Sequence, residues 1–194
     1  MQQILVWKPW TTPGVENLRL SLDSEGIHGS SHLMQNLNGH SIAATYVLEC
    51  DPRWRFRRLW LKADHHGPRT LSLHRDIRGH WYLNDEPRPD LDGCQHVMIP
   101  ASPFTHTPVL QNAALETGES LGLRVAHIDL LTLEVTPRHQ RYHCLQRRPG
   151  HHLYRCEAEG KPPVELTFDD HGLLTACAHY VQLSARTLMA AVPA

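Results

Sequence analysis

The residues best suited to chemistry lie in one central stretch, Leu91–Pro108, which reads LDGCQHVMIPASPFTHTP. It places one cysteine, Cys94, near two histidines, His96 and His106. A thiol becomes a nucleophile when its pKa is lowered and a histidine within hydrogen-bond reach accepts its proton. The stretch is therefore compatible with a cysteine-dependent hydrolase or transferase, with Cys94 as nucleophile and His96 or His106 as base.

A structural cysteine and a zinc site are the alternatives for the same three residues. On a strand, Cys94 and His96 would share a face with α-carbons about 6–7 Å apart, which makes direct contact marginal. The local signatures of cysteine proteases are absent, and a free cysteine is usually a small buried apolar residue. For zinc, the short spacings of a closed site and a nearby fourth ligand are missing. We therefore predict a structural Cys94, no catalytic residue, no tightly bound metal and no cofactor.

The backbone of this stretch indicates a corner in the chain. Asp92 and Gly93 form a turn signal, and a positive φ is expected at Gly93. Pro103 helps to stop the strand and to turn the chain toward a helix. Thr105 and Thr107 can bond to backbone groups where no strand pairs with them. Such a segment would leave a sheet, cross an opening and enter a β-roll as a plug.

Short runs of alternating apolar and polar residues dominate the rest of the chain. Examples are residues 17–22, 41–50, 55–63, 123–136 and 151–159. Turn residues separate such runs at intervals of about 8–12 residues, which is typical of an antiparallel sandwich, roll or barrel. The best helix signal covers Thr107–Glu119, with Thr107 as N-cap and Pro108 at the first helical position. Because nothing resembles a linker, residues 1–194 are predicted to form one mainly β domain with one or two short helices.

The composition excludes several classes of function. With 19 basic and 20 acidic residues, the formal net charge of −1 gives no electrostatic footprint for nucleic acid. The N-terminus lacks the features of a signal peptide, and no stretch approaches the ~18 apolar residues of a membrane span. The five cysteines are odd in number and widely spaced, which argues against a disulfide framework. We expect a cytoplasmic protein with reduced thiols and no stable membrane insertion.

Several motifs, taken in order along the chain, resemble the glycolipid-binding family of bacterial proteins. The most specific is the central one, in which the matching residues are Leu91, Asp92, Gly93, Cys94, Val97, Pro103, Phe104, Thr105 and Thr107. The other matching groups are Gly14, Glu16 and Leu18; Asp51, Trp54 and Arg57; Gly79 and Trp81; and Asp169, Gly172 and Leu173. The sequence departs from the family where His96 and Met98 stand in place of aspartates, His106 in place of an asparagine, Gln111 and Asn112 in place of arginines, and Cys177 and Ala178 in place of a Tyr-Pro.

The resemblance implies a spiral β-roll, a long curled antiparallel sheet partly wrapped around a helix. Its shape would be similar to that of periplasmic lipoprotein carriers, and its partner would be a lipid or a glycolipid-like small molecule. The candidate ligand-binding residues are Trp54, Phe56, Arg57, Trp60, Trp81, Phe104, Thr105 and Thr107, with Arg57 facing a polar head group. The first hypothesis is thus a binding protein for an amphiphile held in a cavity of the curled sheet. The cysteine-dependent enzyme and a protein-interaction module with an exposed sheet face are the alternatives.

Overall fold

The computed structural model describes residues 2–188, and these form one sheet of fifteen strands. The strands are β1 (Gln2–Pro9), β2 (Gly14–Leu22), β3 (Ile27–Leu37), β4 (His40–Cys50), β5 (Phe56–Asp64), β6 (Pro68–Arg75), β7 (Trp81–Leu83), β8 (Glu86–Pro87), β9 (Cys94–Met98), β10 (Ser120–Ile128), β11 (Val135–Arg148), β12 (His151–Ala158), β13 (Val164–Phe168), β14 (Leu174–Cys177) and β15 (Tyr180–Leu188). The helical segments are two 3₁₀ turns, η1 (Pro89–Leu91) and η2 (Pro103–His106), and one α-helix, α1 (Thr107–Ala113). The predicted mainly β fold with one short helix following the proline-rich stretch is confirmed.

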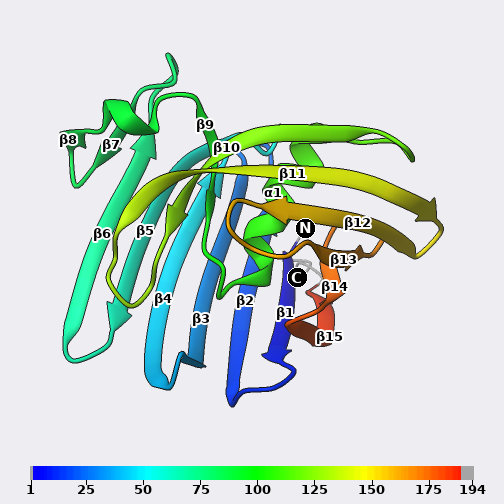
Figure 1. Cartoon of the computed structure of the whole chain (residues 1–194), viewed down its shortest axis with the longest axis horizontal. Helices are drawn as coiled ribbons and strands as arrows, with labels where there is room; N and C mark the ends of the chain where they lie inside the picture. Colours follow the sequence, from blue (N-terminus) through cyan, green and yellow to red (C-terminus); the bar gives the residue numbers. More distant parts are fainter. Residues whose placement is uncertain (1, 189–194) are drawn as a thin grey trace, which may run out of the picture.

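The order of the strands shows how the sheet curls. It runs β8-β7-β6-β5-β4-β3-β2-β1-β15-β14-β13-β12-β11-β10-β9, so the first and last strands of the chain pair in the middle. The two outer edges, β8 and β9, follow one another in sequence and are joined by η1 and a short turn. The sheet is therefore bent back on itself, and in Figure 1 β9–β11 pass across the half formed by β2–β6. This is the predicted spiral β-roll.

One strand pair departs from the expected antiparallel pattern. β9 and β10 are parallel, and a parallel pair needs a crossover connection rather than a hairpin. The crossover here is the segment from Ile99 to Glu119, which contains η2 and α1 and lies between the two halves of the curled sheet in Figure 1. The central stretch of the sequence thus provides the plug of the roll.

The helix is shorter than the pattern predicted. α1 ends at Ala113 rather than Glu119, because Ala114 adopts a left-handed conformation with φ of 48° and the chain then returns Leu115 to the core. The expectation that Thr107 would be the N-cap was wrong, since Thr107 lies inside the first turn and His106 takes the cap position. Within residues 2–188, the buried hydroxyl of Thr107 has no hydrogen-bond partner.

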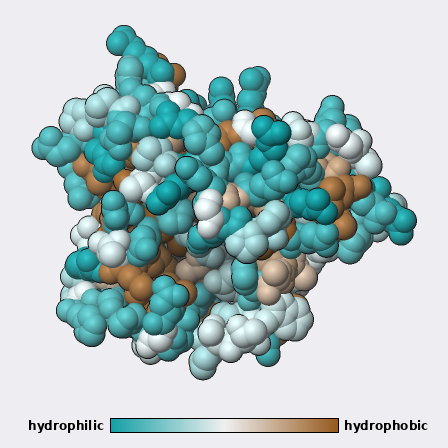
Figure 2. All heavy atoms as spheres, viewed as in Figure 1, coloured by the Kyte–Doolittle hydropathy of each residue, from teal (hydrophilic) through white to brown (hydrophobic). Residues whose placement is uncertain are grey.

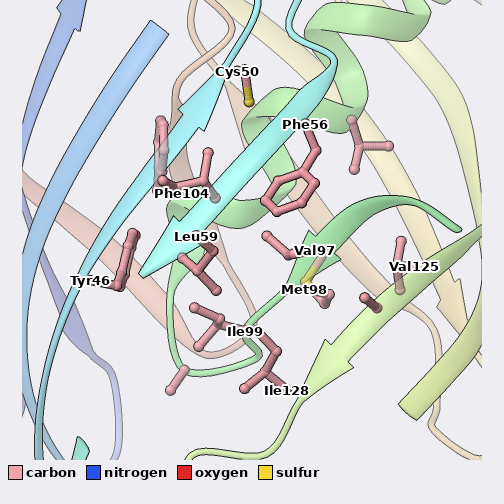
Figure 3. Close-up of a cluster of buried hydrophobic side chains, with 14 of the residues drawn as sticks. Tyr46, Cys50, Phe56, Leu59, Val97, Met98, Ile99, Phe104, Val125 and Ile128 are labelled. Carbon is pink, nitrogen blue, oxygen red and sulfur yellow. The ribbon is translucent and has the colours of Figure 1, made fainter. Parts of the chain in front are cut away.

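The core lies between the two halves of the sheet. Figure 3 shows Phe56 and Leu59 of β5 facing Val97 and Met98 of β9, with Phe104 beside them. A Cβ on Gly29 would lie 2.6 Å from the ring of Phe104, so this glycine permits the plug to press against β3. The interior is consequently filled with side chains.

The outer surface is largely hydrophilic. In the view of Figure 2, hydrophobic atoms gather low over β4–β6 and the loop between β10 and β11. Within the described residues, no helix is long and apolar enough to cross a bilayer.

Candidate functional site

A buried carboxyl group lies where the plug meets the sheet. Glu16 projects inward from β2 and is 1% exposed. Its Oε1 atom is 2.6 Å from the hydroxyl of Ser31 on β3, 2.9 Å from that of Tyr46 on β4 and 2.7 Å from that of Ser102 in the plug. The hydroxyls of Tyr46 and Ser102 also lie 2.7 Å apart. This set, Glu16, Ser31, Tyr46 and Ser102, is called the carboxyl cluster below.

The number of hydrogens in the carboxyl cluster indicates a protonated Glu16. Four oxygen atoms make four close contacts, and each contact needs one hydrogen. Ser31, Tyr46 and Ser102 supply one hydroxyl hydrogen each. A neutral carboxylic acid supplies the fourth, so protonation of Glu16 allows all four contacts to be hydrogen bonds.

The raised pKa of Glu16 agrees with a protonated carboxyl group. Burial raises the pKa of the Glu16 carboxyl from 4.5 to about 7, although the hydroxyl groups around it act in the opposite direction. Within residues 2–188, the second carboxyl oxygen, Oε2, has no hydrogen-bond partner. An ionised carboxylate would leave its charge buried with only neutral donors, which is costly. The carboxyl cluster is therefore a buried site that is protonated below about pH 7 and takes up or releases its proton near neutral pH.

The plug connects the carboxyl cluster to a second polar group nearer the surface. Next to Ser102, the carbonyl of Ala101 accepts a 2.6 Å hydrogen bond from the side-chain amide of Gln35. The carbonyl end of Gln35 in turn accepts a 3.0 Å bond from the hydroxyl of Tyr180. The hydroxyl of Thr105 lies 2.8 Å from the Ser102 carbonyl, which fixes the plug locally. Two segments far apart in sequence, β3 and the start of β15, are thus tied to the same loop.

A hollow opens at this point, at the end of the roll where several turns converge. It has a volume of about 360 Å³ and is bordered by the turn after β1, residues 35–38, Pro100 and Ala101, residues 127–131, Lys161, and His179 with Tyr180. We call it the mouth hollow. Its wall combines amide, hydroxyl, imidazole, ammonium and carboxylate groups with the side chains of Leu37, Leu130 and Leu131. A larger hollow of about 560 Å³ lies over β10–β12, where Arg124, Arg141, Glu157 and Glu159 give it a charged lining.

The geometry around Cys94 opposes a nucleophilic role. The side chain is fully buried, and burial raises the pKa of its thiol to about 11. Burial also lowers the pKa of both His96 and His106 to about 4, so both rings are neutral at neutral pH. Nδ1 of His106 lies 2.7 Å from the hydroxyl of Tyr142. Because a reactive thiol needs a depressed pKa, these residues are poorly placed for cysteine chemistry.

The turn before Cys94 instead joins the two edges of the sheet. Gly93 has φ of 88°, in the left-handed region that favours glycine. The guanidinium group of Arg124 donates a 2.9 Å bond to the Asp92 carbonyl, and the indole N–H of Trp81 donates a 3.1 Å bond to the Cys94 carbonyl. β7, β9 and β10 are therefore held together around this turn.

Three of the predicted ligand-binding aromatics are fully packed core residues. Phe56 and Trp81 stack with ring centroids 4.9 Å apart, and both are at most 2% exposed. Phe104 is completely buried against Gly29. Thr105 and Thr107 are buried with them in the plug.

The other predicted ligand-binding residues lie nearer the surface. Trp54 packs partly against the core, and Trp60 projects from the outer face of β5 with 43% of its surface exposed. Arg57 lies 3.2 Å from Asp51, whose carboxylate also accepts bonds from the backbone of the turn that carries Trp54. Although burial opposes it, these bonds lower the pKa of Asp51. None of the eight predicted residues borders either of the two hollows described above, and their contact with a ligand stays a prediction.

The sequence patterns did not single out the carboxyl cluster, although one signal for it was present. In β2 the residues at alternate positions, Glu16, Leu18 and Leu20, share the inward face. A carboxylate in phase with two core leucines indicates a buried acid. Its partners could not be predicted in the same way, since Ser102 lies 86 positions away.

The comparisons with known proteins agree with the motifs. A family model with the description "Putative glycolipid-binding" matches residues 4–186. The chain belongs to this family. The matched range includes Glu16, the turn that carries Asp51 and Trp54, and the plug. Among curated proteins, none matches the chain.

A solved structure shows the same fold. It is the crystal structure of a DUF1089 family protein from Pseudomonas aeruginosa, which is 30% identical to this chain. The match covers 86% of this chain and 91% of that one, with a TM-score of 0.74.

Proposed function

We propose that this member of the glycolipid-binding family binds an amphiphile whose hydroxyl-rich head group enters the mouth hollow. One observation carries the proposal: amide and hydroxyl side chains stand beside leucines in a hollow bordered by the family's plug segment. Asn36, Asn38 and Thr12 can exchange hydrogen bonds with sugar hydroxyls. Leu37 and Leu131 can cover the apolar atoms next to the head group.

The size of the mouth hollow limits what it can hold. Ligand pockets commonly measure ~300–1,000 Å³, and the 360 Å³ here suits a head group of one or two sugar rings rather than a whole lipid. The alkyl chain would then lie outside, along Leu131 and Leu133. Arg69 of β6 bonds to the carbonyls of Leu131 and Thr132, which holds this loop against β6.

Two other locations are less suitable. The interior of the roll is filled by side chains such as Phe56, Trp81 and Phe104, which would have to separate before an acyl chain could enter. The larger hollow over β10–β12 is lined by arginine and glutamate side chains, which suit an ionic rather than a sugar head group. Both hollows contain apolar and uncharged polar side chains, but of the two only the mouth hollow borders the plug, at Pro100 and Ala101.

A titration with short-chain probes tests the proposal. The protein is titrated with octyl β-glucoside, octyl phosphocholine and glucose, each below its aggregation concentration, and binding is followed by calorimetry. We expect octyl β-glucoside to bind more tightly than either of the others, because only it presents both a sugar and an alkyl chain.

A matched pair of variants locates the binding. Leu131→Asp puts a charge on the wall of the mouth hollow, whereas Leu145→Asp puts the same charge on β11, where the leucine is 37% exposed. The first should weaken octyl β-glucoside binding at least tenfold and the second should leave it unchanged. Equal affinity for the three probes, or equal loss in both variants, would exclude this function for the mouth hollow.

A further inference from the structure

Three histidines from two hairpin turns meet at the end of the roll that carries the mouth hollow. His40 begins β4 after the turn at Asn38 and Gly39, and His65 and His66 form the turn between β5 and β6. One ring nitrogen of each histidine lies within 4.8 Å of those of the other two. The ring centroids of His40 and His65 are 4.9 Å apart and those of His65 and His66 are 4.1 Å apart.

We propose that His40, His65 and His66 bind one divalent transition-metal ion of the Zn²⁺ class. Neutral imidazole nitrogens are preferred ligands of Zn²⁺, Cu²⁺ and Ni²⁺, and zinc bonds to them at ~2.0–2.1 Å. Tetrahedral coordination at that bond length places ligand atoms roughly 3.3 Å apart. The ring nitrogens now lie within 4.8 Å of one another, so binding requires side-chain rotations that bring them closer.

The backbone of the β5–β6 turn fixes two of the three ligands. Asp64 and Pro68 are paired across the strands, so His65, His66 and Gly67 span a tight turn. His66 has φ of 60° and Gly67 has φ of 117°. Positive φ is uncommon for residues other than glycine, although histidine is one of those enriched there, and in this turn the two ring centroids lie 4.1 Å apart.

The position of His65 provides the second feature of a metal ligand. Its Nδ1 atom lies 3.3 Å from the backbone carbonyl of Ser41. Metal-binding histidines usually donate one ring N–H to such a carbonyl, which leaves the other nitrogen unprotonated for the ion. With three imidazole ligands and partial exposure to solvent, the fourth position is open to water or to an external ligand. The site would thus resemble open three-histidine centres rather than closed structural zinc sites.

Zinc titration of tag-free, EDTA-treated protein tests this inference. We expect one Zn²⁺ per chain by calorimetry and a Tm increase of roughly 3–6 °C at a tenfold excess over Kd. Co²⁺ in place of Zn²⁺ should give the visible absorption bands of a four- or five-coordinate ion.

Histidine variants decide where the ion binds. His66→Asn removes the ligand and keeps a residue that tolerates positive φ, and His40→Gln removes the ligand contributed by the other turn. Each should weaken Zn²⁺ binding at least tenfold. The control is His32→Asn, because His32 is an exposed histidine of β3 outside the cluster. Absence of stoichiometric binding, or an equal effect of the control, would refute the site, and neither result bears on octyl β-glucoside binding.

Discussion

Glu16→Gln should remove a pH dependence of stability that the native protein has. The carboxyl is 1% exposed and burial raises its pKa from 4.5 to about 7. Between these two values the folded protein keeps the proton while the unfolded chain has released it. Stability must then fall as the pH rises, because the unfolded state binds fewer protons.

The magnitude follows from the two pKa values. Each pKa unit corresponds to about 1.4 kcal/mol. The rise from 4.5 to about 7 therefore makes the free energy of unfolding about 3 kcal/mol larger at low pH, where Glu16 is protonated, than at high pH, where it is ionised. The favourable contribution is fully present below pH 4.5, declines above it and is lost as the pH passes through about 7. Glutamine has nearly the same shape but does not titrate, so the variant lacks this contribution to the pH dependence.

Urea unfolding of both proteins from pH 4 to pH 8.5 measures the effect. The free energy of unfolding of the native protein, minus that of Glu16→Gln, should decrease by about 3 kcal/mol across this range. Other titrating groups are common to both proteins and cancel in the difference. A Glu25→Gln control, which changes an exposed glutamate, should give a flat difference. Parallel pH profiles for the native protein and Glu16→Gln would refute the buried protonated acid.

Three further predictions concern the core and the turn that joins the sheet edges. Cys94→Ala should cost ~1 kcal/mol of unfolding free energy. Native Cys94 should react with iodoacetamide near neutral pH more slowly than a free thiol, because burial raises its pKa to about 11. Faster alkylation would support the hypothesis that Cys94 is a nucleophile. Gly93→Val should cost about 1–3 kcal/mol in chemical denaturation, since φ is 88° and a Cβ would lie 3.4 Å from Arg124; equal stability would mean that the turn is not strained. Trp81→Ala should lower the free energy of unfolding by about 3–5 kcal/mol because the ring is 1% exposed. Trp54→Ala should lower it by less, because Trp54 is only partly buried. An unchanged Tm for Trp81→Ala would contradict the packed core.

The alternation of residue types was enough to predict the mainly β fold, but not every boundary. Residues 123–136 read as one run of alternating apolar and polar residues, whereas β10 ends at Ile128 and β11 begins at Val135. Between them the side chain of Asp129 accepts bonds from the backbone of Leu131 and Thr132 and closes a turn. Because the turn is rich in leucine, hydrophobicity alone hid it.

The face on which a side chain lies was harder to predict where the pairing is irregular. Phe56 and Trp60 are four residues apart on β5, so regular alternation would place them on the same face. Phe56 nevertheless points into the core and Trp60 points outward. The register between β4 and β5 shifts next to Cys50, which pairs with Phe56. Such a bulge moves the following residues to the opposite face. Trp60 is therefore separated from the aromatic core that the sequence grouped it with.

The carboxyl cluster and the two proposed binding sites depend on contacts that sequence spacing does not encode. The carboxyl cluster and the mouth hollow are assembled when the plug of the β9–β10 crossover reaches strands of the other half of the chain. In the proposed metal site, the pairing of β4 with β5 brings His40 close to His65, which is 25 positions away in the sequence, and to His66. The sequence-based prediction of no tightly bound metal rested on the spacing of Cys94, His96 and His106 and did not consider histidines on separate hairpin turns.

A crystal structure grown with octyl β-glucoside tests the central claim most directly. The account predicts one sugar ring in the mouth hollow, hydrogen-bonded to Asn36 or Asn38, with its alkyl chain directed along Leu131. The packing of Phe56 against Trp81 should remain unchanged. A sugar bound over β10–β12, or an alkyl chain inserted between these two rings, would contradict the account.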